Sequence, residues 1–152
     1  MNDGRYDAIM VGSGHNGLIS AAYLAKAGRR VLVLERRGII GGATVTQEPW
    51  PSYRISTCSH VCKYTPNLRS AIEHVEVRGL RDIETRIGIT GGNIFHGEIL
   101  PEKMFEGRPV PGYSGYRTPI ENLYLCGSGA WPGGAVFGAP GRNCAFEVLG
   151  DR

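Results

Sequence analysis

The chain has 152 residues, enough for one domain with a hydrophobic core and too few for two. Hydrophobic residues make up 41% and charged residues 20%, a balance that is typical of a folded protein and unlike that of a disordered chain. The net charge of +3 is mild and no basic run is present, so we do not expect nucleic acid as a partner. Without a transmembrane-length apolar run or a signal-peptide pattern, we expect a cytoplasmic protein.

Residues 6–35 follow the order strand, helix, strand. The short apolar run at 6–11 predicts a buried parallel strand, and the run at 30–34 predicts a second one. Between them, 16–27 carries apolar residues on one helical face and is followed by Gly28, a residue typical of the position after a helix. This order predicts an α/β fold with a parallel sheet flanked by helices.

Glycines after the first predicted strand have the spacing of a dinucleotide-binding turn. Gly12, Gly14 and Gly17 fit G-x-G-x-x-G, in which the first glycine forms the tight turn and the second admits a pyrophosphate. The third lets the helix pack close to the strand. Glu35 ends the second strand, where a carboxylate accepts hydrogen bonds from the ribose hydroxyls of an adenosine. Together these residues predict a nucleotide site.

A second glycine turn follows Glu35. The pair Gly41-Gly42 is not needed by the strand–helix–strand unit, and it favours a turn that offers backbone N–H groups to an extended dinucleotide. The stretches D-A-I-M-V-G-S-G-H-N-G-L, V-L-V-L-E-R-R and G-G-A-T resemble the amino terminus of FAD-dependent oxidoreductases of the phytoene desaturase and amine oxidase type. Within that family, the sequence resembles the subgroup of the pyridine nucleotide-disulfide oxidoreductase domain-containing protein 2. The resemblance implies that the first glycines hold the FAD pyrophosphate, that Glu35 holds the ribose, and that Gly41-Gly42 lies along the cofactor.

The segment 45–66 contains a predicted strand and a candidate zinc motif. Alternation over Tyr53–Thr57 predicts the short strand, and nearby prolines exclude a long helix. Cys58, His60 and Cys62 have the side chains of zinc ligands, but their spacing is unlike that of zinc fingers and a fourth ligand has no obvious source. We therefore expect no metal site here.

The second part of the chain, 67–152, resembles the carboxy-terminal part of the same family, so that the family's central substrate-binding region is missing. With 1–66 as the amino-terminal part, 1–152 is expected to form a single, truncated Rossmann-like FAD-binding domain. Helices are predicted at Asn67–Val75 and Leu80–Ile87.

A glycine-rich loop, 88–100, contains one histidine, His96. A histidine in such a loop can act as a general acid or base beside a flavin, or it can fix the loop through hydrogen bonds. His96 is therefore the first candidate for a catalytic proton-handling residue, and His60 is the second.

The last glycine-rich pattern covers 122–149. Leu123–Cys126 predicts a strand that lies beside the first one, and a helix is predicted to start near Pro140, which suits a first helical turn. The resemblance implies that Gly127 and Ser128 lie near the FAD diphosphate and ribityl chain. It also implies that 136–140 flanks the isoalloxazine and that the helix amino terminus points at the N1/C2 edge of the flavin.

The motifs and the resemblance together define a set of expected cofactor-binding residues, drawn from both ends of the chain. They are Gly12, Gly14, His15, Asn16, Gly17, Glu35, Arg36, Arg37, Gly41, Gly42, Ala43, Thr44, Gly127, Ser128, Val136, Gly138, Ala139 and Pro140.

The resulting prediction is an FAD-dependent oxidoreductase of the dehydrogenase or desaturase type, with an unknown substrate. One alternative is a non-catalytic flavin-binding protein or a subunit of a split flavoenzyme. Another is an NAD(P)-binding module in which Arg36 and Arg37 address a nucleotide phosphate. Because the region that covers the flavin in the resembling family is missing, exposed apolar surface predicts a homodimer or higher homo-oligomer. The aromatic residues expected at that surface are Phe95, Tyr113, Tyr116, Trp131 and Phe137.

Overall fold

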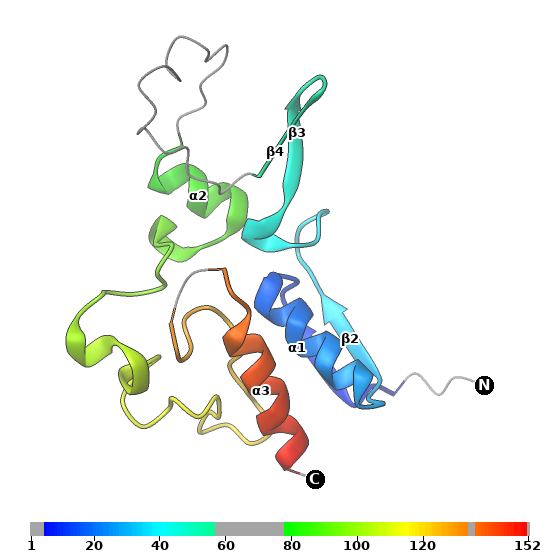
Figure 1. Cartoon of the computed structure of the whole chain (residues 1–152), viewed down its shortest axis with the longest axis vertical. Helices are drawn as coiled ribbons and strands as arrows, with labels where there is room; N and C mark the ends of the chain where they lie inside the picture. Colours follow the sequence, from blue (N-terminus) through cyan, green and yellow to red (C-terminus); the bar gives the residue numbers. More distant parts are fainter. Residues whose placement is uncertain (1–4, 57–77, 134–135, 152) are drawn as a thin grey trace.

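The computed structural model describes residues 5–56, 78–133 and 136–151 (Figure 1). Its first unit consists of β1 (Ala8–Val11), α1 (His15–Lys26) and β2 (Val31–Leu34). The two strands pair in parallel, with Ala8 opposite Val31 and Val11 opposite Leu34. The predicted order of strand, helix and strand is confirmed, and the chain is an α/β protein.

The core lies between this small sheet and two helices. Met10 of β1 faces α1, where Leu24 is buried, and Ala145 of α3 (Ala139–Gly150) completes the cluster. The two helices lie side by side on one face of the sheet (Figure 1). Side chains alternate along a strand, so Ile9 and Val11 point to the other face, where they are 57% and 87% exposed. In the described part of the chain, helices therefore cover one face of the sheet only.

The close approach of α1 and α3 depends on a glycine. A Cβ atom on Gly141 would lie 2.1 Å from the carbonyl oxygen of Asn16. Real Cβ atoms do not approach backbone oxygens so closely, so this crossing requires a residue without a side chain. Pro140 precedes it in the first helical turn, as predicted from its fixed φ.

A hairpin follows the first unit and projects away from it (Figure 1). It is formed by β3 (Thr46–Trp50) and β4 (Tyr53–Ser56), which pair antiparallel. The strand predicted at Tyr53–Thr57 is confirmed as β4. The partner strand, β3, was not predicted because it contains Pro49, and proline is rare inside strands. The pairing register is irregular between Gln47 and Trp50, which lie on either side of this proline.

The helix α2 (Leu80–Ile87) agrees with the prediction for this segment. The Asp82 carboxylate accepts a hydrogen bond from the Gly79 N–H at 2.8 Å, which satisfies a backbone donor at the helix start. Gly88 ends the helix with φ of 83°, in the left-handed region that glycine favours. The helix predicted at Asn67–Val75 and the motif Cys58-x-His60-x-Cys62 lie outside the described residues.

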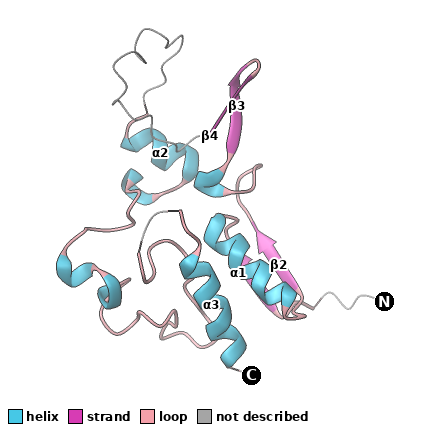
Figure 2. Cartoon of the chain, viewed as in Figure 1, coloured by secondary structure: helices cyan, strands magenta, loops and turns pink. Residues whose placement is uncertain are grey.

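Between α2 and α3 the described chain is mostly loop, with three short 3-10 turns (Figure 2). These turns are Thr90–Gly92, Pro101–Lys103 and Phe105–Gly107.

The strand predicted at Leu123–Cys126 is wrong. This segment forms an isolated antiparallel bridge between Tyr124 and Arg117 and does not join β1. The Thr118 N–H donates to the Leu123 carbonyl oxygen at 3.2 Å, and the Leu125 N–H donates to that of Tyr116 at 2.7 Å. These bonds use one edge of the segment, and no backbone hydrogen bond among the described residues joins its other edge to β1.

One of the five aromatic residues expected at an open surface is instead buried. Tyr116 is 7% exposed, and its hydroxyl donates to the carbonyl oxygen of Trp131 at 2.9 Å. The same hydroxyl accepts a hydrogen bond from the Asn143 side chain at 2.9 Å. Tyr116 therefore anchors the loop to α3. Trp131 is partly buried against the same cluster, whereas Phe95, Tyr113 and Phe137 are exposed.

Candidate functional site

The first glycine turn has one glycine that protein packing does not explain. Gly12 has φ of 101°, and a Cβ atom on Gly17 would lie 2.4 Å from the Gly12 carbonyl oxygen, so both positions need glycine for the backbone itself. Gly14 has φ of −65°, and a Cβ atom there would meet nothing within 4 Å. The space beside Gly14 is therefore open, as expected for the glycine that admits a phosphate.

The second glycine turn packs directly on the first. The Gly41 N–H donates to the Ser13 carbonyl oxygen at 3.0 Å, and Gly14 and Gly41 form an isolated parallel bridge. A Cβ atom on Gly42 would lie 2.9 Å from the Gly14 Cα. The two turns thus form one continuous wall, and this close packing explains the glycine at position 42.

Glu35 fastens this wall to the end of β2. Its Oε2 accepts hydrogen bonds from the Ser13 N–H at 2.8 Å and from the Ser13 hydroxyl at 2.7 Å, and its Oε1 accepts one from the Arg37 N–H at 2.9 Å. These donors, led by the Arg37 and Ser13 backbone, lower the pKa of Glu35 to about 2. The carboxylate is therefore ionised at neutral pH and shapes the first glycine turn, a role that the spacing alone did not reveal.

A pH-dependent stability follows from this arrangement. The folded pKa of Glu35 is about 2 and its ordinary value is 4.5, so its contribution to stability is complete above pH 4.5 and is lost as the pH falls towards 2. In urea unfolding between these pH values, the free-energy advantage of the native protein over Glu35→Gln should shrink as the pH falls. A constant difference across that range would contradict the hydrogen bonds assigned to Glu35.

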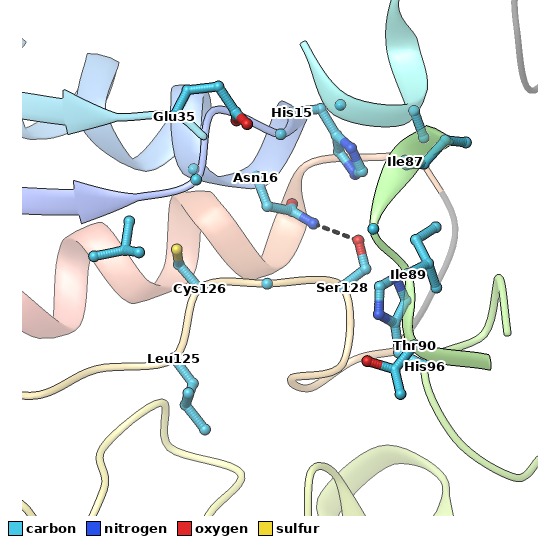
Figure 3. A pocket seen from close by; sticks show the side chains of 18 of the residues that line it. His15, Asn16, Glu35, Ile87, Ile89, Thr90, His96, Leu125, Cys126 and Ser128 are labelled. Atoms are coloured by element: carbon cyan, nitrogen blue, oxygen red, sulfur yellow. Dashed lines mark hydrogen bonds between the residues drawn. The ribbon is translucent and has the colours of Figure 1, made fainter. Parts of the chain in front are cut away.

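Asn16 joins the two ends of the sequence. It is 3% exposed, its side-chain nitrogen donates to Ser128 Oγ at 2.9 Å, and its side-chain oxygen accepts from the Gly141 N–H at 3.3 Å. Figure 3 shows the first of these bonds at the centre of the cavity. One buried amide therefore holds the start of α1, the Gly127-Ser128 turn and the first turn of α3 together. Sequence reasoning placed Asn16 in the site but did not identify this bridge.

The two glycine turns, Glu35, Asn16 and the Gly127-Ser128 turn border one cavity of about 1260 Å³. This volume exceeds the several hundred Å³ of a site for a compact small molecule and suits an extended dinucleotide. In Figure 3, Glu35 lies towards one side, while His15, Ser128, Thr90 and His96 gather at the other. Twelve of the expected cofactor-binding residues line it: Gly12, Gly14, His15, Asn16, Gly17, Glu35, Arg36, Arg37, Gly42, Ala43, Gly127 and Ser128.

The other six expected residues do not line the cavity. Gly41 and Thr44 stabilise the second glycine turn without lining the cavity, because the Thr44 N–H donates to the Gly41 carbonyl oxygen at 3.1 Å. Gly138 precedes α3 with φ of 72°, in the left-handed region that glycine favours, so this glycine serves the backbone at the start of the helix. Val136, Ala139 and Pro140 also lie outside the lining.

A third wall of the cavity is formed by residues that were not among the expected cofactor-binding ones. It comes from the end of α2 and the loop after it, and includes Ile87, Gly88, Ile89, Thr90 and Asn93. The Arg36 guanidinium packs so closely on Gly88 that a Cβ atom there would lie 1.9 Å from its Nη2. The glycine at the end of α2 was visible in the sequence, but its contact with Arg36 was not.

His96 lines the cavity, and an arginine supports it. Arg108 is 5% exposed and donates from Nη1 to the carbonyl oxygen of Phe95 at 2.8 Å, next to His96. Desolvation of the imidazole, followed by the charges of Arg108 and His15, lowers the pKa of His96 from its ordinary value. His96 is therefore neutral at pH 7, with one ring nitrogen able to accept a proton. The second candidate, His60, lies outside the described residues.

The residues present fit a phosphate-bearing dinucleotide. The amino terminus of α1 borders the cavity, and it has neither a side-chain cap nor an acidic residue in its first turn. Its backbone N–H groups and positive helix end therefore face the space beside Gly14. Arg37 also lines the cavity, and its buried Nη1 has no hydrogen-bond partner among the described residues.

Comparison with known proteins agrees with this geometry. Residues 10–75 match the family described as NAD(P)-binding Rossmann-like domain. This segment contains the glycine turns, Glu35 and both strands of the parallel sheet, apart from the first residues of β1. The chain thus carries a Rossmann-like nucleotide-binding domain.

Several relatives that match the chain are oxidoreductases by name. The pyridine nucleotide-disulfide oxidoreductase domain-containing protein 2 of Rattus norvegicus is 38% identical over 113 residues, which are 74% of this chain and 19% of the relative. A limonene dehydrogenase subunit of Castellaniella defragrans is 60% identical over 42 residues, 28% of this chain and 8% of the relative. All-trans-retinol 13,14-reductase of Rattus norvegicus is 57% identical over 42 residues, 28% of this chain and 7% of the relative.

The chain is therefore homologous to these oxidoreductases, and the predicted resemblance is confirmed. It spans about a fifth of the length of the first of them. A Rossmann-like domain in such relatives is typical of flavin or nicotinamide cofactors. Within the described residues, no helix is both long and apolar enough to span a membrane.

Proposed function

We propose that this chain binds FAD and forms the cofactor site of an FAD-dependent oxidoreductase. The observation that carries the proposal is that both glycine-rich ends of the sequence border one cavity, joined by the Asn16–Ser128 hydrogen bond. A site for a nicotinamide dinucleotide needs the first glycine motif and the acid, but it does not need the Gly127-Ser128 turn on the opposite wall. In this proposal the whole chain acts as one domain, with 1–66 and 67–152 supplying the two sides.

The chain's own residues have distinct tasks in this site. Backbone N–H groups at the start of α1 and the Arg37 guanidinium bind the phosphates, and Glu35 orients the ribose while it holds Ser13. Ser128 and His15 border the side away from Glu35, where the isoalloxazine is proposed to lie (Figure 3). The bound flavin supplies two-electron hydride chemistry. His96, held neutral, accepts a proton from the substrate at a ring nitrogen.

Spectroscopy of the purified chain tests this function. Visible flavin absorption, or its appearance on titration with FAD, is the expected result, with no comparable binding of NADH or NADPH. Tight binding of a nicotinamide cofactor without FAD binding would favour the NAD(P) module, with Arg36 and Arg37 on the nucleotide phosphate. Turnover with an artificial electron acceptor then separates an enzyme from a flavin-binding protein or the subunit of a split flavoenzyme.

His96 provides a prediction for the catalytic step. We expect His96→Gln to lower turnover by about 100-fold or more, because glutamine cannot accept the proton, while FAD binding is retained. His15→Gln serves as a comparison, since it removes the other imidazole of the cavity. Full activity of His96→Gln with an unchanged pH profile would limit His96 to a structural role.

We also propose that the chain works as a homodimer in the cytoplasm. The bare face of the β1–β2 sheet exposes Ile9, and the exposed aromatic residues Phe95, Tyr113 and Phe137 add apolar surface. A two-fold partner covers the same surface on both subunits. Light scattering of the FAD-loaded protein at micromolar concentration is expected to give the mass of a dimer. A stable monomer would contradict this proposal.

A further inference from the structure

Two cysteines meet on the wall of the cavity. Cys126 precedes the Gly127-Ser128 turn, and Cys144 lies in α3 and is 2% exposed. Their thiols interact, and Cys126 packs against the buried cluster that contains Cys144. Figure 3 shows the Cys126 sulfur directed towards α3. Neither cysteine forms a disulfide in the structure.

The two thiols differ in access and in acidity. Cys126 lines the cavity and is reached from it, whereas Cys144 is enclosed behind it. The neighbouring Cys144 thiol lowers the pKa of Cys126, whereas burial raises it. Two effects raise the pKa of Cys144: the neighbouring Cys126 thiol has the larger effect, and burial the smaller one. An accessible, more acidic thiol beside an enclosed second thiol is the arrangement of cysteines that react with peroxides.

We propose that Cys126 and Cys144 form a peroxide-reactive dithiol, in which Cys126 is oxidised first and Cys144 resolves it to a disulfide. The Cys126 thiolate attacks one oxygen of hydrogen peroxide, the O–O bond breaks, and hydroxide leaves and takes up a proton to form water. The sulfenic acid on Cys126 is then attacked by the Cys144 sulfur, which releases the second water. Overall, two thiols and one hydrogen peroxide give one disulfide and two water molecules.

The product would cross-link two elements that build the cavity. The sulfurs of a disulfide are about 2.05 Å apart, so the two neighbouring thiols must move closer for the bond to form. The bond would tie the segment before Ser128 to α3, which Asn16 already joins through Ser128 and Gly141. The proposal does not depend on which cofactor occupies the cavity.

Thiol titration and peptide mapping test the proposal. The sequence has four cysteines, and a Cys58→Ser/Cys62→Ser variant leaves only this pair. In that variant, hydrogen peroxide is expected to reduce the titratable thiols of the unfolded protein from two per chain to none. Non-reducing peptide mapping should show a Cys126–Cys144 link that dithiothreitol cleaves.

Single variants in the same background establish the order of reaction. With Cys144→Ala, dimedone is expected to label Cys126 as a sulfenic acid after peroxide treatment. With Cys126→Ala, Cys144 should react with peroxide at least tenfold more slowly than Cys126 reacts in the Cys144→Ala variant. Circular dichroism identifies a variant that fails to fold, in which case the rate of thiol loss in the folded Cys58→Ser/Cys62→Ser protein decides. Two thiols that survive peroxide there, or a faster reaction at Cys144 than at Cys126, would overturn the proposal.

Discussion

Gly14→Val is expected to leave the fold intact and to weaken FAD binding by about tenfold or more, a free-energy loss of at least about 1.4 kcal/mol. Gly14 has φ of −65° and ψ of 165°, an extended conformation that valine adopts without strain. A Cβ atom there meets no protein atom within 4 Å, so the new side chain enters the open space of the cavity. In the proposed complex that space holds the pyrophosphate, and the valine methyl groups exclude it.

The control for this prediction is Gly38→Val. A Cβ atom on Gly38 also meets nothing within 4 Å, and Gly38 does not line the cavity. The same substitution there should leave FAD affinity unchanged. FAD titration by flavin fluorescence, together with a urea unfolding curve for each variant, gives both quantities. Equal FAD affinities for the Gly14 and Gly38 variants would contradict the placement of the pyrophosphate beside the glycine turn.

The predictable part of the site is the part that is local in sequence. Gly12 and Gly17 were assigned their roles correctly, because the residues that require a glycine there lie within a few positions of it. The β1–α1–β2 order was predictable for the same reason, since each element follows directly from the previous one.

Contacts between distant segments account for what was missed. Leu123–Cys126 pairs with the preceding loop through the Thr118 and Leu125 hydrogen bonds, and not with β1, which lies at the other end of the sequence. No periodicity in the segment itself distinguishes between these two pairings. Likewise, Asn16 was placed in the site by its motif, but its bonds to Ser128 and Gly141 cross 112 and 125 residues of sequence. Such a bridge is visible only once both ends of the chain are folded together.

Gly141→Ala is expected to destabilise the protein by about 1–3 kcal/mol, the usual cost of forcing extra volume into a packed interior. The added Cβ atom would lie 2.1 Å from the Asn16 carbonyl oxygen, and a backbone atom cannot move aside as a flexible side chain can. Separation of α3 from α1 would also break the hydrogen bond from the Gly141 N–H to the Asn16 side chain. FAD affinity should therefore fall as well, because Asn16 positions Ser128.

Gly150→Ala is the matched control, since it makes the same change in the same helix. Gly150 is the last residue of α3, it is exposed, and a Cβ atom there meets nothing within 4 Å. Its effect on the free energy of unfolding should stay within about 0.5 kcal/mol, and FAD affinity should not change. Urea midpoints for the two variants measure the difference directly. If Gly141→Ala were as stable as Gly150→Ala, the close crossing of α1 and α3, and with it the bridge through Asn16, would be wrong.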